Sequence, residues 1–194
     1  MSAHAGPEQR REWVLEAVEQ YEAPLVRFAW RLVGDEHAAR DIVQHVFLRL
    51  CDQAPEELEG RMAQWLFAVC RNKAIDWLRW RKRSSGASEL ELPRCPSHEP
   101  DPAAAAEQRD LVQQLGRLIG DLPAGQREAV SLWVEGLSYR QIAETLETSE
   151  GNVRVLMHRA IKRLRENAAS RRWQAKPTGA ETGAKPEIAS EVPS

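Results

Sequence analysis

The sequence predicts an all-α protein of two small helical domains joined by a flexible linker, the second a four-helix domain with a helix-turn-helix. Apolar residues recur at the i, i+3, i+4 spacing of helices on both sides of a Ser-, Pro- and acid-rich stretch at 84–102. The sequence has no strand-like alternation, glycine-rich phosphate loop or internal repeat. With 194 residues and 42% hydrophobic content, the chain can form two small cores.

The first predicted domain, residues 1–83, contains three helices. The first covers 10–33, and Pro24 inside it predicts either a kink or two abutting helices. Gly34 ends this helix and Asp35 caps the next. The second helix covers about 36–53 and buries Ala38, Ile42, Val43, Val46, Phe47 and Leu50. The third covers about 61–82 and buries Met62, Trp65, Leu66, Val69, Ile75 and Leu78.

After the flexible linker at 84–102, the second predicted domain spans residues 103–169. A helix at about 103–120 is followed by one near 125–135, which Gly136 ends. Ser138 caps a third helix, which buries Ile142, Ala143 and Leu146. Thr148 or Ser149 caps the fourth. The fourth helix buries Val153, Leu156, Met157, Ala160 or Ile161, and Leu164. The tail, 170–194, is predicted to be disordered because it has little to bury.

Composition and cysteine usage point to the cytoplasm. The sequence contains neither the apolar stretch of a signal peptide nor an apolar run long enough to span a bilayer. Its three cysteines are too few for a disulfide framework, and Cys51 and Cys70 are predicted to be buried free thiols. Cys95 and His98 have half of the spacing of a zinc site but no second pair, so no metal is expected.

Charge is distributed unevenly along a chain whose formal net charge is only −2. Residues 1–60 contain six arginines against twelve acidic residues, whereas residues 61–83 contain seven basic residues against Asp76 alone. Residues 152–165 contain five basic residues and no acid. Two separate basic segments indicate either a polyanion bound at two places or two solvated helix faces.

The segment SYRQIAETLETSEGNVRVLMHRAIKRLRE has the pattern of a helix-turn-helix, whose second helix enters the DNA major groove. Arginine can pair with guanine there, asparagine with adenine, and valine can contact a thymine methyl group. An ordinary helical hairpin with a basic solvent face is the alternative. The predicted DNA-contacting side chains are Asn152, Arg154, Val155, His158, Arg159 and Lys162.

The first basic segment, RNKAIDWLRWRKR, alternates tryptophan with cationic residues. This mixture suits unstacked single strands, because bases stack on aromatic rings while phosphates meet arginine and lysine. Trp77 is predicted to pack in the core with Leu78. For Trp80 both a core and a base-stacking position remain open.

Three segments together resemble sigma factors of the sigma-70 family, in the extracytoplasmic-function (ECF) group. They are DIVQHVFLRL (41–50), WLFAVCRNKAIDWLRWRKR (65–83) and LPAGQREAVSLWVEGLSYRQIAETLETSEGNVRVLMHRAIKRLR (122–165), in the family's order and separated by a suitable linker. The resemblance covers about residues 10–168.

The resemblance implies that the protein is a non-catalytic initiation factor. Its N-terminal domain would bind the β′ clamp helices of core RNA polymerase and melt the promoter −10 element. Its C-terminal domain would bind the −35 element and the β flap. The implied polymerase-binding residues are Asp41, Gln44, His45, Phe47 and Leu48. The implied −10 binding and melting residues are Asn72, Arg71, Lys73, Arg79, Trp80 and Arg81. Promoter DNA and an anti-sigma factor would be further partners; no cofactor and no small-molecule substrate are implied.

The sequence departs from the family pattern at three positions. His45 replaces an acid that is usual in the polymerase-binding helix. Val155 and Leu156 stand where serine and arginine are common in the recognition helix. Two other functions stay open: a stand-alone helix-turn-helix transcription regulator, and a degenerate sigma-like protein that binds polymerase without initiating transcription. An enzyme is not expected, because no catalytic set has credible spacing.

Overall fold

The structure, a computed structural model, describes residues 6–84, 116 and 118–174 of the chain. All regular secondary structure within these residues is helical, as predicted. Most of the predicted linker, most of the helix expected at 103–120, both Cys95 and His98, and residues 175–194 lie outside the described residues. None of the described helices is both long and apolar enough to cross a membrane.

Helix α1 (Pro7–Val33) is one continuous helix with Pro24 inside it, so the alternative of two abutting helices is wrong. It ends as predicted at Gly34, which takes the left-handed conformation with φ 68° and donates its N–H to the Trp30 carbonyl at 2.8 Å. The buried side of α1 includes Leu25, Phe28 and Ala29. This side forms one wall of the N-terminal core.

Helix α2 (Glu36–Cys51) begins as predicted, with Asp35 Oδ1 accepting a hydrogen bond from the Ala38 N–H at 2.9 Å. Five of the six residues predicted to be buried are buried, but Phe47 is only partly buried against the core. Cys51 is exposed, so its predicted burial is also wrong. It is the last residue of the helix, where the chain leaves the core, and its carbonyl accepts a hydrogen bond from Arg10 at 2.6 Å.

Helix α3 (Met62–Ser84) follows a turn that contains the short 3-10 helix η1 (Pro55–Glu57). Its fully buried residues are Leu66, Phe67, Cys70 and Ala74. Of the residues predicted to be buried, only Leu66 is fully buried; Met62, Trp65, Val69 and Leu78 flank the core, and Ile75 is half-buried. The rotation of the helix places Phe67 and the smaller Cys70 and Ala74 at the fully buried positions, beside Leu66.

The buried side of α3 packs against both α1 and α2. The Phe67 ring meets the Phe28 ring of α1 edge-on, with centroids 5.3 Å apart and an interplanar angle of 86°. Cys70 is fully buried, as predicted, and burial raises the pKa of its thiol. The Cys70 thiol is therefore a packing group.

The C-terminal helices are α5 (Ala124–Val134), α6 (Tyr139–Thr145) and α7 (Glu150–Gln174). Gly136 follows α5 with φ 91°, as expected for the residue that ends a helix. Ala160 rather than Ile161 occupies the core position of α7, and Ile161 is 38% exposed. Helix α7 continues to Gln174, past the predicted domain boundary at 169.

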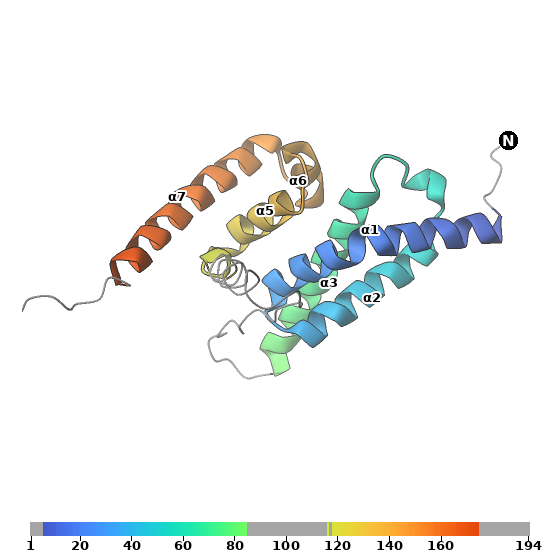
Figure 1. Cartoon of the computed structure of the whole chain (residues 1–194), viewed down its shortest axis with the longest axis horizontal. Helices are drawn as coiled ribbons and strands as arrows, with labels where there is room; N and C mark the ends of the chain where they lie inside the picture. The colour runs from blue at the N-terminus through green and yellow to red at the C-terminus, as the bar shows by residue number, and fades with distance from the viewer. Residues whose placement is uncertain (1–5, 85–115, 117, 175–194) are drawn as a thin grey trace, which may run out of the picture.

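The two groups of helices lie against each other. In Figure 1, α5 and α6 lie beside α1 and α3, while α7 extends away from the N-terminal helices. Helix α5 contacts α1, and α6 contacts α3. Of the elements that form the surface between the two groups, α3 also carries predicted functional residues.

The position of Phe67 yields the first prediction. Phe67→Ala should lower the unfolding free energy by about 3–5 kcal/mol, because it removes a fully buried ring and leaves a cavity beside Phe28. Urea denaturation followed by circular dichroism measures the loss. Phe47→Ala, the same change at a partly exposed ring, is the control and should cost markedly less. Equal losses in the two variants would contradict the packing described here.

Candidate nucleic-acid interface

The turn between α6 and α7 is held by local hydrogen bonds. Ser138 and Gln141 form a reciprocal capping box at the start of α6, with distances of 3.3 and 2.9 Å. Glu147 takes a left-handed conformation with φ 52°, and the next residue, Thr148, donates its N–H to the Ala143 carbonyl at 2.9 Å. Ser149 Oγ then accepts from the Asn152 N–H at 3.2 Å and caps α7.

Helix α7 presents its predicted DNA-contacting residues on one exposed side. Val153, Met157 and Ala160 are buried on the other side. Because successive residues turn by about 100°, the exposed residues lie opposite this buried stripe. The structure therefore brings together all six predicted residues, which are Asn152, Arg154, Val155, His158, Arg159 and Lys162. Val155 is 43% exposed, so its side chain is accessible from solvent on this side.

Two side-chain pairs in the first turns of α7 were not predicted from the sequence. Asn152 Nδ2 donates to Thr148 Oγ1 at 3.0 Å, and Arg154 pairs with Glu150 at 3.0 Å. The Asn152 pair leaves one amide hydrogen and the Oδ1 atom free to meet a base edge. Both pairs join residues four positions apart, a spacing that brings side chains together on a helix, and this spacing could have predicted them from the sequence.

Four of the six predicted −10 residues share the exposed half of α3. Asn72, Lys73, Arg79 and Trp80 are exposed, and the Trp80 side chain remains 56% accessible. Trp80 therefore lies outside the core, in a position where a base could stack on its ring. Arg79 lies 3.3 Å from Asp76 in a pair whose side chains are both more than two-thirds exposed, so water screens this interaction.

The other two −10 candidates point elsewhere. Arg81 lies over the ring of Trp77 at 5.1 Å, and Trp77 packs against the core as predicted. Arg71 is turned by about 100° from Asn72 and pairs with Glu128 of α5 at 2.6 Å. The guanidinium of Arg71 is therefore already occupied by a carboxylate from the C-terminal helices.

Helix α2 carries the predicted polymerase-binding surface. Asp41, Gln44, His45 and Leu48 share one side of the helix, and Leu48 is 68% exposed. Phe47 lies about a third of a turn away and packs partly on the core. Burial, with smaller contributions from the positive charges of Lys73 and Arg49, lowers the pKa of His45. The His45 imidazole thus lies where the α2 surface meets the basic side of α3.

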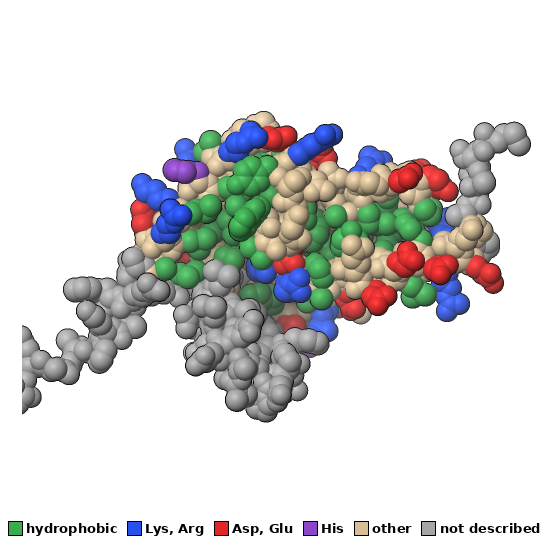
Figure 2. Space-filling view, turned by 45° about the horizontal axis from the view of Figure 1, so that its top comes forward, with side chains coloured by type: hydrophobic (Ala, Val, Ile, Leu, Met, Phe, Trp, Pro, Cys, Tyr) green, Lys and Arg blue, Asp and Glu red, His purple; other side chains and the backbone are tan. Residues whose placement is uncertain are grey.

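The charges of the surface are segregated. Figure 2 shows Lys and Arg side chains gathered over the α6–α7 end of the visible face, and Asp and Glu side chains dominating the opposite end of α1. The exposed acidic residues of α1 are Glu8, Glu12, Glu16, Glu19 and Glu22. Such segregation concentrates positive potential on the helices that carry the predicted contacts.

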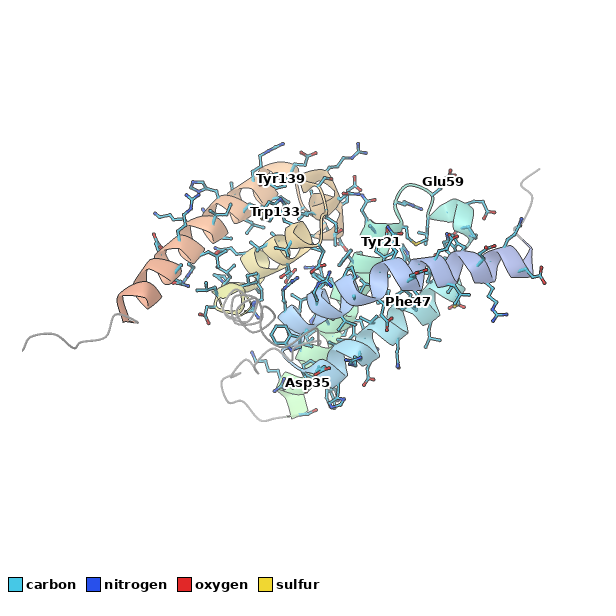
Figure 3. The ribbon with its side chains drawn as sticks, in the orientation of Figure 1. Tyr21, Asp35, Phe47, Glu59, Trp133 and Tyr139 are labelled. Atoms are coloured by element: carbon cyan, nitrogen blue, oxygen red, sulfur yellow. The ribbon has the colours of Figure 1, made fainter. Side chains whose placement is uncertain are left out.

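Further features of the surface were missing from the sequence-based interpretation. Trp133 and Val134, at the end of α5, are 52% and 43% exposed, and Figure 3 marks Trp133 on this helix. Arg27 and Arg31 of α1 both pair with Glu135, and Gln64 of α3 donates to Glu144 of α6. These contacts join residues far apart in the sequence, so helical periodicity gave no signal for them.

No group of three or more potential metal-ligating side chains occurs among residues 6–84, 116 and 118–174. The main surface features of the described residues are the exposed basic sides of α3 and α7 and the mixed polar–apolar side of α2.

Family models match both halves of the chain. The model described as Sigma-70 region 2 matches residues 17–84, and the model described as Sigma-70, region 4 matches residues 112–164. The two matches contain α2 and α3 in one case and α5, α6 and the first part of α7 in the other. They coincide with the segments that carry the candidate surfaces.

Named relatives agree with these matches. The chain is 33% identical over 156 residues to the ECF RNA polymerase sigma factor SigE of Mycolicibacterium smegmatis, covering 79% of this chain and 61% of that relative. It is 34% identical over 152 residues to the ECF RNA polymerase sigma factor SigL of Mycobacterium tuberculosis, covering 76% of this chain and 84% of the relative.

Two solved structures share the fold. One is CnrH in complex with the cytosolic domain of CnrY, with a TM-score of 0.59 and 21% identity, covering 82% of this chain and 90% of that chain. The other is the sigma factor RpoE in complex with the anti-sigma factor NepR from Bartonella quintana, with a TM-score of 0.63 and 24% identity, covering 82% of this chain and 98% of that chain.

The lowered pKa of His45 predicts a pH dependence of stability. The unfolded chain binds the His45 proton more tightly than the folded chain does, so the folded state loses stability as pH falls below about 6.5. His45→Gln removes this dependence. Its unfolding free energy, from urea titrations at about pH 7.5 and about pH 5.5, should fall less than that of the wild type.

The same pair of titrations on His37→Gln controls for the loss of a histidine from α2. An equal pH dependence in the wild type and in His45→Gln would contradict the prediction.

Proposed function

Because the chain belongs to the sigma-70 family, in its ECF group, and is therefore an RNA polymerase sigma factor, we propose that it binds core polymerase and directs promoter-specific initiation. In this proposal α2 binds the polymerase, the exposed half of α3 binds and melts the −10 element, and α7 reads the −35 element. The observation that carries the proposal is the exposure of Asn72, Lys73, Arg79 and Trp80 on one helix, next to the α2 surface.

The α3 surface has the chemistry that strand separation requires. An unstacked base can lie on the exposed Trp80 ring, and the Asn72 amide can donate to and accept from a base edge. Lys73 and Arg79 supply positive charge for the backbone of the melted strand. The resemblance assigns Asn72 to a base flipped from the stack, and its exposed position suits that role.

The α7 surface suits duplex reading in the major groove. The capped N-terminal turns present Asn152 and Val155, which can contact adenine and a thymine methyl group. Arg154, His158, Arg159 and Lys162 surround them with groups that meet bases or phosphates. Leu156, where the family often has arginine, is partly buried against the core, so it offers no phosphate contact.

The polymerase contacts follow from exposure and charge. The β′ clamp helices would meet Asp41, Gln44, His45, Phe47 and Leu48, with Leu48 as the exposed apolar anchor. The β flap would bind the C-terminal helices. Both activities place the protein in the cytoplasm, where polymerase and promoters are.

An anti-sigma factor is a further proposed partner. The RpoE structure contains the anti-sigma factor NepR, and the CnrH structure contains the cytosolic domain of CnrY. An inhibitor of this chain would gain most by covering the α2 surface, since the proposed polymerase contacts lie there.

In vitro transcription from a genomic fragment library tests the proposal. Core polymerase with this protein should give transcript starts that share spaced −10 and −35 motifs, and core polymerase alone should not. Intact polymerase binding with no new starts would contradict an initiating role and favour the degenerate sigma-like alternative.

Asn72→Ala separates initiation from binding. The variant should keep its affinity for core polymerase but lose open-complex formation, measured by permanganate reactivity of the −10 region. A loss of about 5–150-fold is expected, since a contact to one base contributes about 1–3 kcal/mol. Gln20→Ala, which removes an exposed amide from α1, is the control. Wild-type melting by Asn72→Ala would remove this residue from the proposed site.

A further inference from the structure

The turn between α6 and α7 holds Thr148 in a fixed position beside the first turn of α7. The N–H of Glu147 donates to the Glu144 carbonyl at 3.2 Å, and the N–H of Thr148 donates to the Ala143 carbonyl at 2.9 Å. With the left-handed φ of 52° at Glu147, these two bonds form a Schellman motif that ends α6. The Thr148 side chain therefore starts from a backbone that is tied to the preceding helix.

The Thr148 hydroxyl binds a side chain and is not the cap of α7. Ser149 Oγ accepts from the Asn152 backbone N–H at 3.2 Å, and the Ser149 carbonyl accepts from the Val153 N–H at 3.0 Å. Ser149 thus caps the helix. Thr148 Oγ1, on a half-buried residue, accepts from Asn152 Nδ2 at 3.0 Å. This bond orients the Asn152 amide.

The orientation of the Asn152 amide decides which groups it can offer to a base. An asparagine amide has two N–H donors and one carbonyl acceptor. Its terminal torsion has a broad range, so a free amide can turn either edge toward DNA. Because one N–H of Asn152 is donated to Thr148, the remaining groups are one donor and the Oδ1 acceptor.

One donor beside one acceptor is the complement of adenine and not of guanine. In the major groove adenine presents the N7 acceptor and the N6 donor, whereas guanine presents two acceptors, N7 and O6. Against guanine, Oδ1 of Asn152 would face O6, and neither oxygen would have a donor. An amide released from Thr148 has both hydrogens available for the two acceptors of guanine. The Thr148 hydroxyl therefore favours adenine over guanine.

The neighbouring side chains leave the Asn152 amide open to a duplex. Asn152 is exposed, and so is Val155 one turn later on the same side of α7. Arg154 pairs with Glu150 at 3.0 Å, but these side chains are 62% and 42% exposed, so water screens the pair and either partner can leave it. A duplex that covers the turn excludes water and strengthens the bond between Thr148 and Asn152.

We propose that Thr148 is a positioning residue for −35 recognition, whose hydroxyl binds one amide hydrogen of Asn152 and thereby makes Asn152 select adenine over guanine. The inference rests on the proposed function, since it takes α7 to read the −35 element. It adds the base specificity of one contact and the residue that sets this specificity.

Selection from a promoter pool with a randomised −35 region tests the proposal. The pool is made from a promoter that the full-length chain uses with core polymerase, and sequencing of the bound duplexes gives the base preference at each position. The wild type should prefer adenine to guanine at one position where Asn152→Ala loses this preference. Thr148→Val, which removes the hydroxyl but keeps the side-chain shape, should lower the adenine-to-guanine ratio there by about 2–12-fold, the factor for one neutral hydrogen bond.

Two controls separate positioning from a structural role of the turn. Thr148→Ser keeps the hydroxyl and should keep the adenine-to-guanine ratio of the wild type. In the Asn152→Ala background, Thr148→Val should have no further effect on this ratio, because Thr148 acts through Asn152. A role of Thr148 in folding alone would instead change the preference at every position read by α7.

An unchanged ratio in Thr148→Val overturns the proposal. Equal losses in Thr148→Val and Thr148→Ser also overturn it, because the hydroxyl would not be the cause, and so does an equal loss at every position. If Thr148→Val does not fold by circular dichroism, Thr148→Ala is judged by the same outcomes.

Failure of this inference can be distinguished from failure of the proposed function. A wild-type chain that gives promoter-specific starts and enriches a −35 motif, but without an adenine that depends on Asn152, overturns the role of Thr148 alone. A wild-type chain that binds core polymerase and gives no promoter-specific starts overturns the proposed function, and the role of Thr148 with it.

Discussion

The packing of α3 against both α1 and α2 is the contact on which the N-terminal surface depends. Leu66, Phe67, Cys70 and Ala74 fix the rotation of α3, since all four are fully buried. When the buried side of a helix is fixed, its exposed residues are fixed as well, because each residue is turned by about 100° from the last. Asn72 and Trp80 are therefore presented to solvent by the core beneath them. The same rotation directs Arg71 sideways, toward α5.

Sequence reasoning predicted the exposed and buried sides of α7 more completely than the N-terminal core. In α7 the fully buried residues form a narrow stripe, and Val153 and Met157 identified the buried side, although the choice between Ala160 and Ile161 was left open. Helix α3 has apolar or aromatic residues around much of its circumference, and several rotations fitted the pattern. Packing selected small residues such as Ala74, which pattern reasoning undervalues because close helix approach depends on the partner. The predicted burial of Phe47 and Cys51 was wrong for a related reason. Their exposure depends on where α2 passes the edge of the core.

The contacts between the helical groups could not be predicted from periodicity. Glu128 and Glu135 read in the sequence as ordinary solvated acids, and Arg27 and Arg31 as ordinary surface arginines. The burial of Glu128, Glu135 and Arg31 arises only when α5 lies against α1 and α3, whereas Arg27 stays half exposed at the edge of this contact. Arg71 illustrates the difference. A basic segment indicates affinity for polyanions, but whether each arginine is free depends on acids more than fifty residues away in the chain.

These contacts give the unequal charge distribution a structural meaning. A protein that binds DNA at two basic surfaces would bind any duplex if both were always accessible, because each neutralised phosphate adds affinity regardless of sequence. The acids of this chain lie in two kinds of place. Those of α1, such as Glu16, lie on an exposed side away from the basic helices, where salt screens them. Glu135 and Glu128 instead lie against arginines in a largely buried interface. There, salt screens charges much less, and each carboxylate is held against particular guanidinium groups. Only the second kind occupies particular arginine side chains, so their position matters more than the net charge of −2.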